Sequence, residues 1–191
     1  MMKTKWTWIA SPVLALVVLT PLGAQIRQRK ENQQQRIAEG VENGSLTAGE
    51  TAKLEGKEAK LNKEIAKDRA ANSGKLTPAE KAQVNKQQNQ LSNQIYNQKH
   101  DAQTAKYGSG TVGQRRENQQ DRIAQGIENK SLTAGETAKL EGKEAKLNKE
   151  IAADRAANGG KLTPAEKQQV NHQQNALSKQ IYKQKHDAQK R

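Results

Sequence analysis

The segment Ser45–Asn72, SLTAGETAKLEGKEAKLNKEIAKDRAAN, decides the fold of this chain, because it returns as residues 131–158 with a single difference. It is built mainly from Ala, Lys, Glu and Leu, which all favour the helical conformation. Thr47 is followed three residues later by Glu50, the spacing of a capping box, in which two side chains satisfy the free amides at a helix start. Each copy therefore predicts a long helix, which in the first copy ends near Ala71.

A further helical stretch lies on each side of this long helix. Residues 31–42 carry Ile37 and Val41 one turn apart, and residues 78–103 open with a second capping box, Thr77–Glu80. Asn-Gly and Asn-Ser-Gly separate the stretches and are typical of helix ends. We predict that the second and third helices fold back on each other. In this antiparallel register Leu54 meets Ile95, Ile65 meets Val84, Leu61 meets Gln88 and Glu58 meets Leu91.

The second half of the chain repeats this plan. Residues 117–128 precede two more capping boxes, at Thr133 and Thr163. Between the halves, residues 104–113 (TAKYGSGTVG) are rich in Gly, which predicts a flexible linker. We therefore expect an all-α fold of two tandem three-helix units, residues 25–103 and 114–191, joined by the 104–113 linker.

Residues 1–24 have the pattern of a secretory signal peptide. Two early lysines precede an apolar run over residues 9–22, and Gly23 and Ala24 follow it. The run is shorter than the roughly 20 residues that span a bilayer. We predict export to the periplasm or the exterior, with no transmembrane segment in the mature chain. Because the chain has no cysteine, packing rather than disulfides must hold the mature protein together.

The formal net charge of +13 raises the question of a polyanionic partner. Acidic and basic residues alternate along the same predicted helices, which is typical of a solvated helix surface rather than a nucleic-acid interface. Only three tyrosines remain as aromatic side chains beyond the signal peptide, so few could stack on bases. Nucleic acid is therefore an unlikely partner. We expect an anionic envelope polymer or an envelope protein, with self-association of exposed helix faces as a further possibility.

The turns at 44–50 and 74–80 share the pattern G-x-L-T-x-x-E, which resembles the second half of an EF-hand loop. In that family the Gly makes the bend and the Glu binds calcium through both carboxylate oxygens. The resemblance implies a low-affinity calcium site. Its candidate ligands are Glu39, Asn43, Thr47 and Glu50 in the first turn, and Glu136 in the third.

The first half of each loop departs from the EF-hand pattern. The first loop position, which is Asp in the family, is Glu39, Arg69, Gln125 or Arg155, and Lys130 replaces the bend Gly in the third turn. Two interpretations therefore stand side by side. The glutamates either bind calcium or only close the capping boxes, and we favour the second.

The motif Tyr96–Asp101, YNQKHD, returns as YKQKHD at Tyr182–Asp187. A His and an Asp could contribute to a zinc or copper site, although two ligands from one unit are too few. We expect instead that the tyrosine covers the edge of the core, and that Lys and His lie at a helix C-terminus, where the helix dipole favours them.

The arrangement also resembles the tandem helical repeats of exported bacterial proteins, over residues 29–187. No Ser-His-Asp arrangement or thiolate site is indicated. We therefore expect a protein that is not an enzyme and acts as a binding or structural module of the cell envelope, with low-affinity calcium binding as the alternative function.

Overall fold

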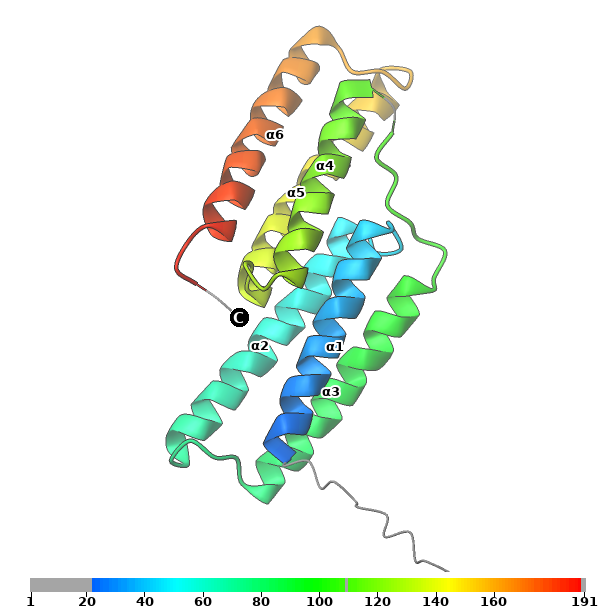
Figure 1. Ribbon diagram of the computed structural model, residues 1–191. Helices are drawn as coiled ribbons and strands as arrows, with labels where there is room; N and C mark the ends of the chain where they lie inside the picture. Colours follow the sequence, from blue (N-terminus) through cyan, green and yellow to red (C-terminus); the bar gives the residue numbers. More distant parts are fainter. Residues whose placement is uncertain (1–21, 109, 190–191) are drawn as a thin grey trace, which may run out of the picture.

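The computed structural model describes residues 22–108 and 110–189 of the chain. Over these ranges it contains six helices and no strand (Figure 1). The prediction of an all-α fold is confirmed. No described helix is long and apolar enough to cross a lipid bilayer. The helices are α1 (Leu22–Glu42), α2 (Ala48–Ala71), α3 (Pro78–Lys99), α4 (Gly110–Glu128), α5 (Ala134–Ala157) and α6 (Pro164–Lys185).

Four helices begin at the predicted capping boxes. In α2, α3, α5 and α6 the N-cap threonine side chain accepts from the backbone N–H of the glutamate three residues on, and that glutamate accepts from the threonine N–H. At the start of α2 these bonds measure 3.4 and 2.8 Å between Thr47 and Glu50. They satisfy backbone donors that have no partner inside a helix, which is why the four starts could be read from the sequence.

The first helix of each repeat is longer than predicted. α1 begins at Leu22 rather than at 31, and α4 begins at Gly110 rather than at 117, so residues 110–113 of the predicted linker belong to a helix. Ile26 and Val112 explain the extension, because each is buried at the outer end of its repeat. A single buried apolar residue per added stretch produces too little periodicity for a sequence-based prediction. Residues 1–21, most of the predicted signal peptide, lie outside the described residues.

The last helix of each repeat is shorter than predicted. α3 ends at Lys99 rather than at 103, with His100 as its C-cap. Beyond it, Asp101 accepts a hydrogen bond of 2.8 Å from the backbone N–H of Gln103, an Asx turn that competes with the helical bonds.

The predicted antiparallel packing of α2 on α3 is supported by two bonds across the pair. Lys57 donates to Gln94 at 2.6 Å, and Gln87 donates to Glu64 at 2.9 Å. Gln88 differs from the prediction. Its side chain donates to the carbonyl of Ile26 at 2.9 Å, so it faces α1. The same arrangement recurs in α4, α5 and α6, where Gln174 donates to Val112 at 3.0 Å.

The two repeats share one core. The largest cluster of buried apolar side chains draws on all six helices and lies where the two repeats overlap at the middle of the molecule (Figure 1). A smaller cluster fills the outer end of each repeat. The central cluster comprises Ile37, Ala38, Val41, Leu46, Leu54, Leu91, Ile95, Ile123, Ala124, Ile127, Leu132, Leu140, Leu177 and Ile181.

Small residues let α2 and α5 approach closely at this central contact. A Cβ added to Gly49 would lie 3.9 Å from that of Ala145, and one added to Gly135 would lie 4.0 Å from that of Ala59. The two reciprocal contacts show that the helices run antiparallel and that the repeats are related by an approximate twofold axis. Because each repeat presents the same surface to the other, the interface resembles that of a symmetric dimer.

The segment after α3 lies against both repeats. The N–H of Ala105 donates to the carbonyl of Gly44 at 2.8 Å. The carbonyl of Tyr107 accepts from Arg116 of α4 at 3.0 Å. Residues 105–107 therefore make specific contacts with the helices on both sides.

Candidate functional site

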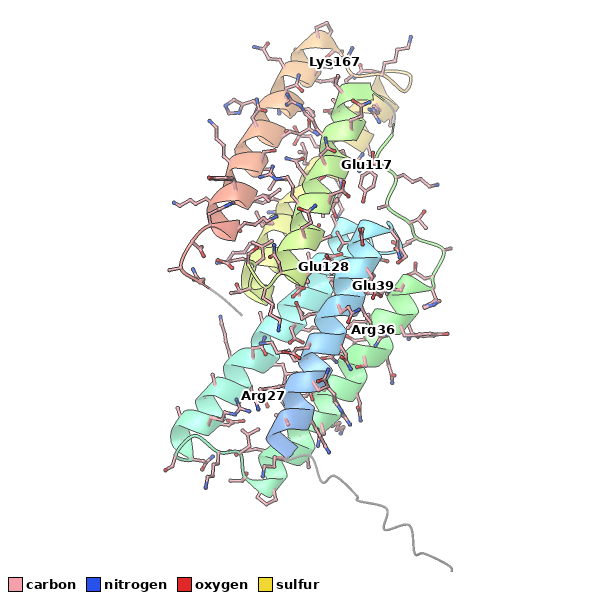
Figure 2. The ribbon with its side chains drawn as sticks, in the orientation of Figure 1. Arg27, Arg36, Glu39, Glu117, Glu128 and Lys167 are labelled. Carbon is pink, nitrogen blue, oxygen red and sulfur yellow. The ribbon has the colours of Figure 1, made fainter. Side chains whose placement is uncertain are left out.

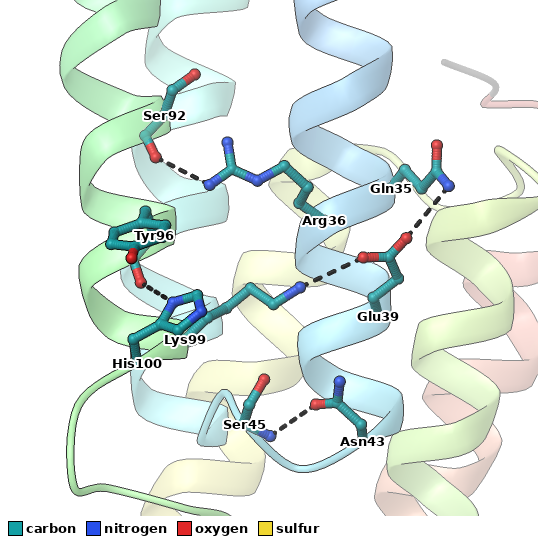
Figure 3. A network of polar contacts seen from close by, with 9 residues as sticks. All are labelled: Gln35, Arg36, Glu39, Asn43, Ser45, Ser92, Tyr96, Lys99 and His100. Carbon is teal, nitrogen blue, oxygen red and sulfur yellow. Dashed lines mark hydrogen bonds and ion pairs between the residues drawn. The ribbon is translucent and has the colours of Figure 1, made fainter.

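The predicted calcium ligands are engaged in bonds within the protein. Glu50 Oε2 accepts from both the backbone N–H and the hydroxyl of Thr47, at 2.8 and 2.7 Å. Asn43 Oδ1 accepts from the N–H of Ser45 at 2.9 Å. Glu39 accepts from Lys99 at 3.3 Å, as part of the network between α1 and α3 in Figure 3. These contacts give each side chain a local structural role.

The candidate glutamates Glu39, Glu50 and Glu136 do not form one metal-binding group. Glu136, the fifth candidate, caps α5 as Glu50 caps α2, with Oε2 2.8 Å from the backbone nitrogen of Thr133. Among residues 22–108 and 110–189, no group of three or more His, Asp or Glu side chains is placed to hold a metal ion. The sequence predicted the capping function of these glutamates directly, because each capping box lies within four residues. Their spacing along the chain could not show whether they meet at a common metal site.

The Tyr-His motif lies on the surface. Tyr96 is 57 % exposed and Tyr182 is 60 % exposed, so the prediction that they cover the core edge is wrong. Each ring instead stacks on the histidine one turn later, with centroids 4.2 Å apart for Tyr96 and His100 (Figure 3). His100 Nδ1 lies 2.7 Å from the Tyr96 carbonyl, which requires the proton on that nitrogen.

Buried carboxylates line the contact between the repeats. Glu55 and Glu141 are fully buried on α2 and α5. Gln34 donates to Glu55 at 3.2 Å, and Gln120 donates to Glu141 at 3.1 Å. Burial raises the pKa of Glu141 well above its usual value. The hydrogen bond from Gln120 opposes the rise, while the charges of Glu144 and Glu55 add to it.

The second repeat also contains a buried ion pair. Arg116 Nε lies 3.8 Å from Glu144 Oε1, and the guanidinium is 5.7 Å from the centre of the Tyr107 ring. Burial raises the pKa of Glu144 to about 7, although the charge of Arg116 limits the rise. Burial likewise raises the pKa of Tyr107 to about 12. These groups are held by packing rather than exposed to a substrate, which indicates a structural role.

A charged cleft of about 800 Å³ lies between the repeats. We call it the lysine cleft. Lys30 and Lys63 line it from the first repeat, and Lys139, Lys143 and Lys183 line it from the second. Its acidic residues are Glu136, which is buried and caps α5, and Asp187. None of the five lysines belongs to an ion pair among the described residues, so the cleft carries excess positive charge.

Sequence reasoning missed this cleft because its residues come from both repeats. Each repeat as a whole has nearly balanced charge, and only the packing of α2 against α5 brings the lysines of different helices to one place. Comparison of the chain with models of known protein families, with curated proteins and with solved structures yields no match.

Proposed function

We propose that this protein is an exported, non-enzymatic module of the cell envelope that binds an anionic envelope polymer. The observation that carries the proposal is the lysine cleft, where five ammonium groups from two repeats surround one open space. A flexible polymer with regularly spaced negative charges can approach several of these groups at once. Electrostatic attraction of this kind favours rapid association without a precisely shaped pocket.

The duplication allows the lysine cleft to be compared with the corresponding surface on the other side of the approximate twofold axis. The residue that corresponds to Lys30 is Arg116, which is buried in its ion pair with Glu144. The residue that corresponds to Lys183 is the neutral Asn97. The lysine cleft therefore holds two more available cations than the corresponding surface around Lys53, Lys57 and Lys149.

This asymmetry provides a matched experiment. Binding of the mature chain, residues 25–191, to polyphosphate is measured by calorimetry at low and high salt. We expect saturable binding that weakens as salt rises. The triple variant Lys63→Gln, Lys139→Gln, Lys143→Gln should bind at least tenfold more weakly. The equivalent variant Lys149→Gln, Lys53→Gln, Lys57→Gln removes the same charge and should bind nearly as well as wild type. Equal losses in both variants would show that only net charge matters and would contradict a defined site.

Export is tested by determining the N-terminal residue of the protein recovered from outside the cytoplasm. Cleavage after Ala24 would leave Gln25 as the first residue and would remove only the first three residues of α1. Ile26, which packs in the outer cluster of the first repeat, would be kept. An intact N-terminus on the cellular protein would contradict the proposal of export with cleavage.

Calcium binding remains a hypothesis with its own test. Titration of the mature chain with calcium, in wild type and in Glu50→Gln and Glu136→Gln, would detect it. Saturable heat that these substitutions remove would establish the turns as calcium sites. Because the same carboxylates cap α2 and α5, each variant needs a melting curve to separate lost binding from lost stability.

A further inference from the structure

The approximate twofold axis creates two equivalent clefts, and the chain itself fills one of them. We call it the linker cleft. Ala105 enters at Gly44, where its N–H donates to the Gly44 carbonyl at 2.8 Å. Tyr107 follows, with its carbonyl 3.0 Å from Arg116 Nη1. The segment leaves past Gly113, where an added Cβ would lie only 2.9 Å from the Tyr107 carbonyl oxygen. Residues 105–108 thus cross from the α1–α2 turn to the start of α4.

The equivalent cleft on the other side of the axis is open. It has a volume of about 490 Å³. Arg27 from α1 and Glu128 from the end of α4, both labelled in Figure 2, line it. We call it the open cleft. Its residues Arg27, Lys30, Gln34, Gln35, Ile127 and Lys130 correspond to Gly113, Arg116, Gln120, Asp121, Val41 and Gly44 of the linker cleft.

The residues that differ between the two clefts include those that contact the linker in the linker cleft. Gly44 and Gly113 both lie where the linker touches the rest of the chain. An added Cβ at Gly113 would clash with the backbone of residues 107 and 108, whereas one at Gly44 would lie 3.6 Å from the Cβ of Ala105, an ordinary contact. At the same two positions the open cleft has Lys130 and Arg27, whose long side chains form its rim. Lys130 extends over the rim to Glu31, with 3.0 Å between Nζ and Oε1. Both of these groups are more than half exposed, so a ligand can displace the pair at little cost.

We propose that the open cleft binds an extended peptide segment that carries a tyrosine, as the linker cleft holds residues 105–108. Lys30 takes the place of Arg116, so its ammonium group can donate to a peptide carbonyl and face an aromatic ring. Gln34 takes the place of Gln120, and Ile127, which is almost fully buried in the central cluster, lines the cleft at the position that corresponds to Val41. The partner is thus a peptide or protein tail. The open cleft shares Lys30 with the lysine cleft, but its ligand is a peptide rather than a polyanion, and the proposal does not depend on polyanion binding.

The test uses the mature chain and a peptide with the linker's own sequence, TAKYGSG (residues 104–110), acetylated and amidated. Binding is followed by nuclear magnetic resonance, which reports the amides of Lys30, Gln34 and Lys130 separately from their counterparts. We expect saturable shifts at these residues. A peptide with Ala in place of Tyr should bind at least tenfold more weakly.

Two variants make the assignment specific. Gln35→Trp places a large side chain in the open cleft at an exposed helix position and should weaken binding at least tenfold. Gln83→Trp makes the same change at an exposed position of α3 outside the cleft and should bind as wild type does. Lys130→Gly introduces the glycine of the linker cleft and should tighten binding. The melting curve of each variant shows that it is folded.

Three results would overturn the proposal. They are no saturable binding, binding that Gln35→Trp leaves unchanged, and shifts confined to the linker cleft around Arg116. Light scattering of the chain without peptide tests whether a second copy of the chain occupies the open cleft. Dimerisation that Gln35→Trp abolishes would show that a second copy fills the cleft, and would exclude a separate peptide partner.

Discussion

At the scale of single residues, Lys130 combines an unfavourable backbone with a favourable contact. Its φ of +62° lies in the left-handed region, like the +71° of its counterpart Gly44. This region costs a residue with a Cβ about 1–2 kcal/mol. The ion pair of Lys130 with Glu31 is exposed and contributes at most about 1 kcal/mol.

We therefore expect Lys130→Gly to be more stable than Lys130→Ala by roughly 1 kcal/mol, because both lose the ion pair and only glycine relieves the backbone. Urea denaturation of the two variants measures the difference directly. Gly44→Ala is the converse control and should destabilise the protein by a similar amount. Equal stability of the two Lys130 variants would show that the turn relaxes to another conformation.

Gly40 and Gly56 provide a second comparison between residues of the same type. A Cβ at Gly40 would lie 2.6 Å from Cδ1 of Leu46, which is fully buried, whereas a Cβ at Gly56 meets no atom within 4 Å. Gly40→Ala should lower the free energy of unfolding by about 1–3 kcal/mol through overpacking. Gly56→Ala should raise it by roughly 0.5–1 kcal/mol through helix propensity. Thermal melts of both variants test the prediction, which fails if they shift the melting temperature in the same direction.

At the scale of helices, local signals predicted the elements well. The capping boxes at Thr47, Thr77, Thr133 and Thr163 act within four residues of chain, so their physics is fully contained in the sequence. The hairpin of α2 and α3 was predictable because one short turn joins the two helices. The starts of α1 and α4 were not, because Ile26 and Val112 extend them by docking on distant residues.

The contact between α2 and α5 depends on residues that looked unfavourable in the sequence. Gly49 and Gly135 weaken a helix by propensity, yet they allow the close crossing with Ala145 and Ala59. Such residues acquire their role only when the second repeat is in place. The lysine cleft and the open cleft could not be predicted for the same reason.

The ion pair between α4 and α5 predicts a dependence of stability on pH. Burial raises the pKa of Glu144 to about 7 from a usual value of 4.5, with Arg116 facing it and Glu141 and Tyr107 nearby. Because the pKa is higher in the folded state, the stability that the neutral carboxyl contributes is complete below about pH 4.5. It is lost as the pH rises through about 7, by roughly 3 kcal/mol. Glu141 shifts in the same direction.

Denaturation of wild type and Glu144→Gln at pH 5 and pH 8 measures this effect. We expect the variant to lose less stability between the two values than wild type does, because glutamine does not ionise. Glu117→Gln, at an exposed position of α4, should leave the wild-type difference unchanged. If Glu144→Gln keeps the full wild-type difference, the pH dependence arises from other groups.

At the scale of the whole molecule, the shared core determines how the protein unfolds. Two units that were joined only by a flexible linker and did not pack together would melt separately. The central cluster instead contains Ile37 and Leu54 of the first repeat beside Ile123 and Leu140 of the second. Unfolding either repeat would expose the inner face of the other, including its buried glutamates. The free energy of the interface is therefore part of the stability of both repeats.

We expect a single cooperative melting transition for the mature chain, followed by circular dichroism and by calorimetry. Ile37→Ala removes a fully buried side chain from the central cluster, which should cost about 2–5 kcal/mol and lower the temperature of the whole transition. Val84→Ala, in the outer cluster of the first repeat, should also shift the whole transition, by a smaller amount because fewer methyl groups are lost. Hydrogen exchange should then show faster exchange in α5 and α6 of both variants, although the substitutions lie in α1 and α3.

A second transition that keeps its wild-type temperature would show that the repeats are energetically independent. In that case the approximate twofold contact would hold the repeats together without stabilising either one.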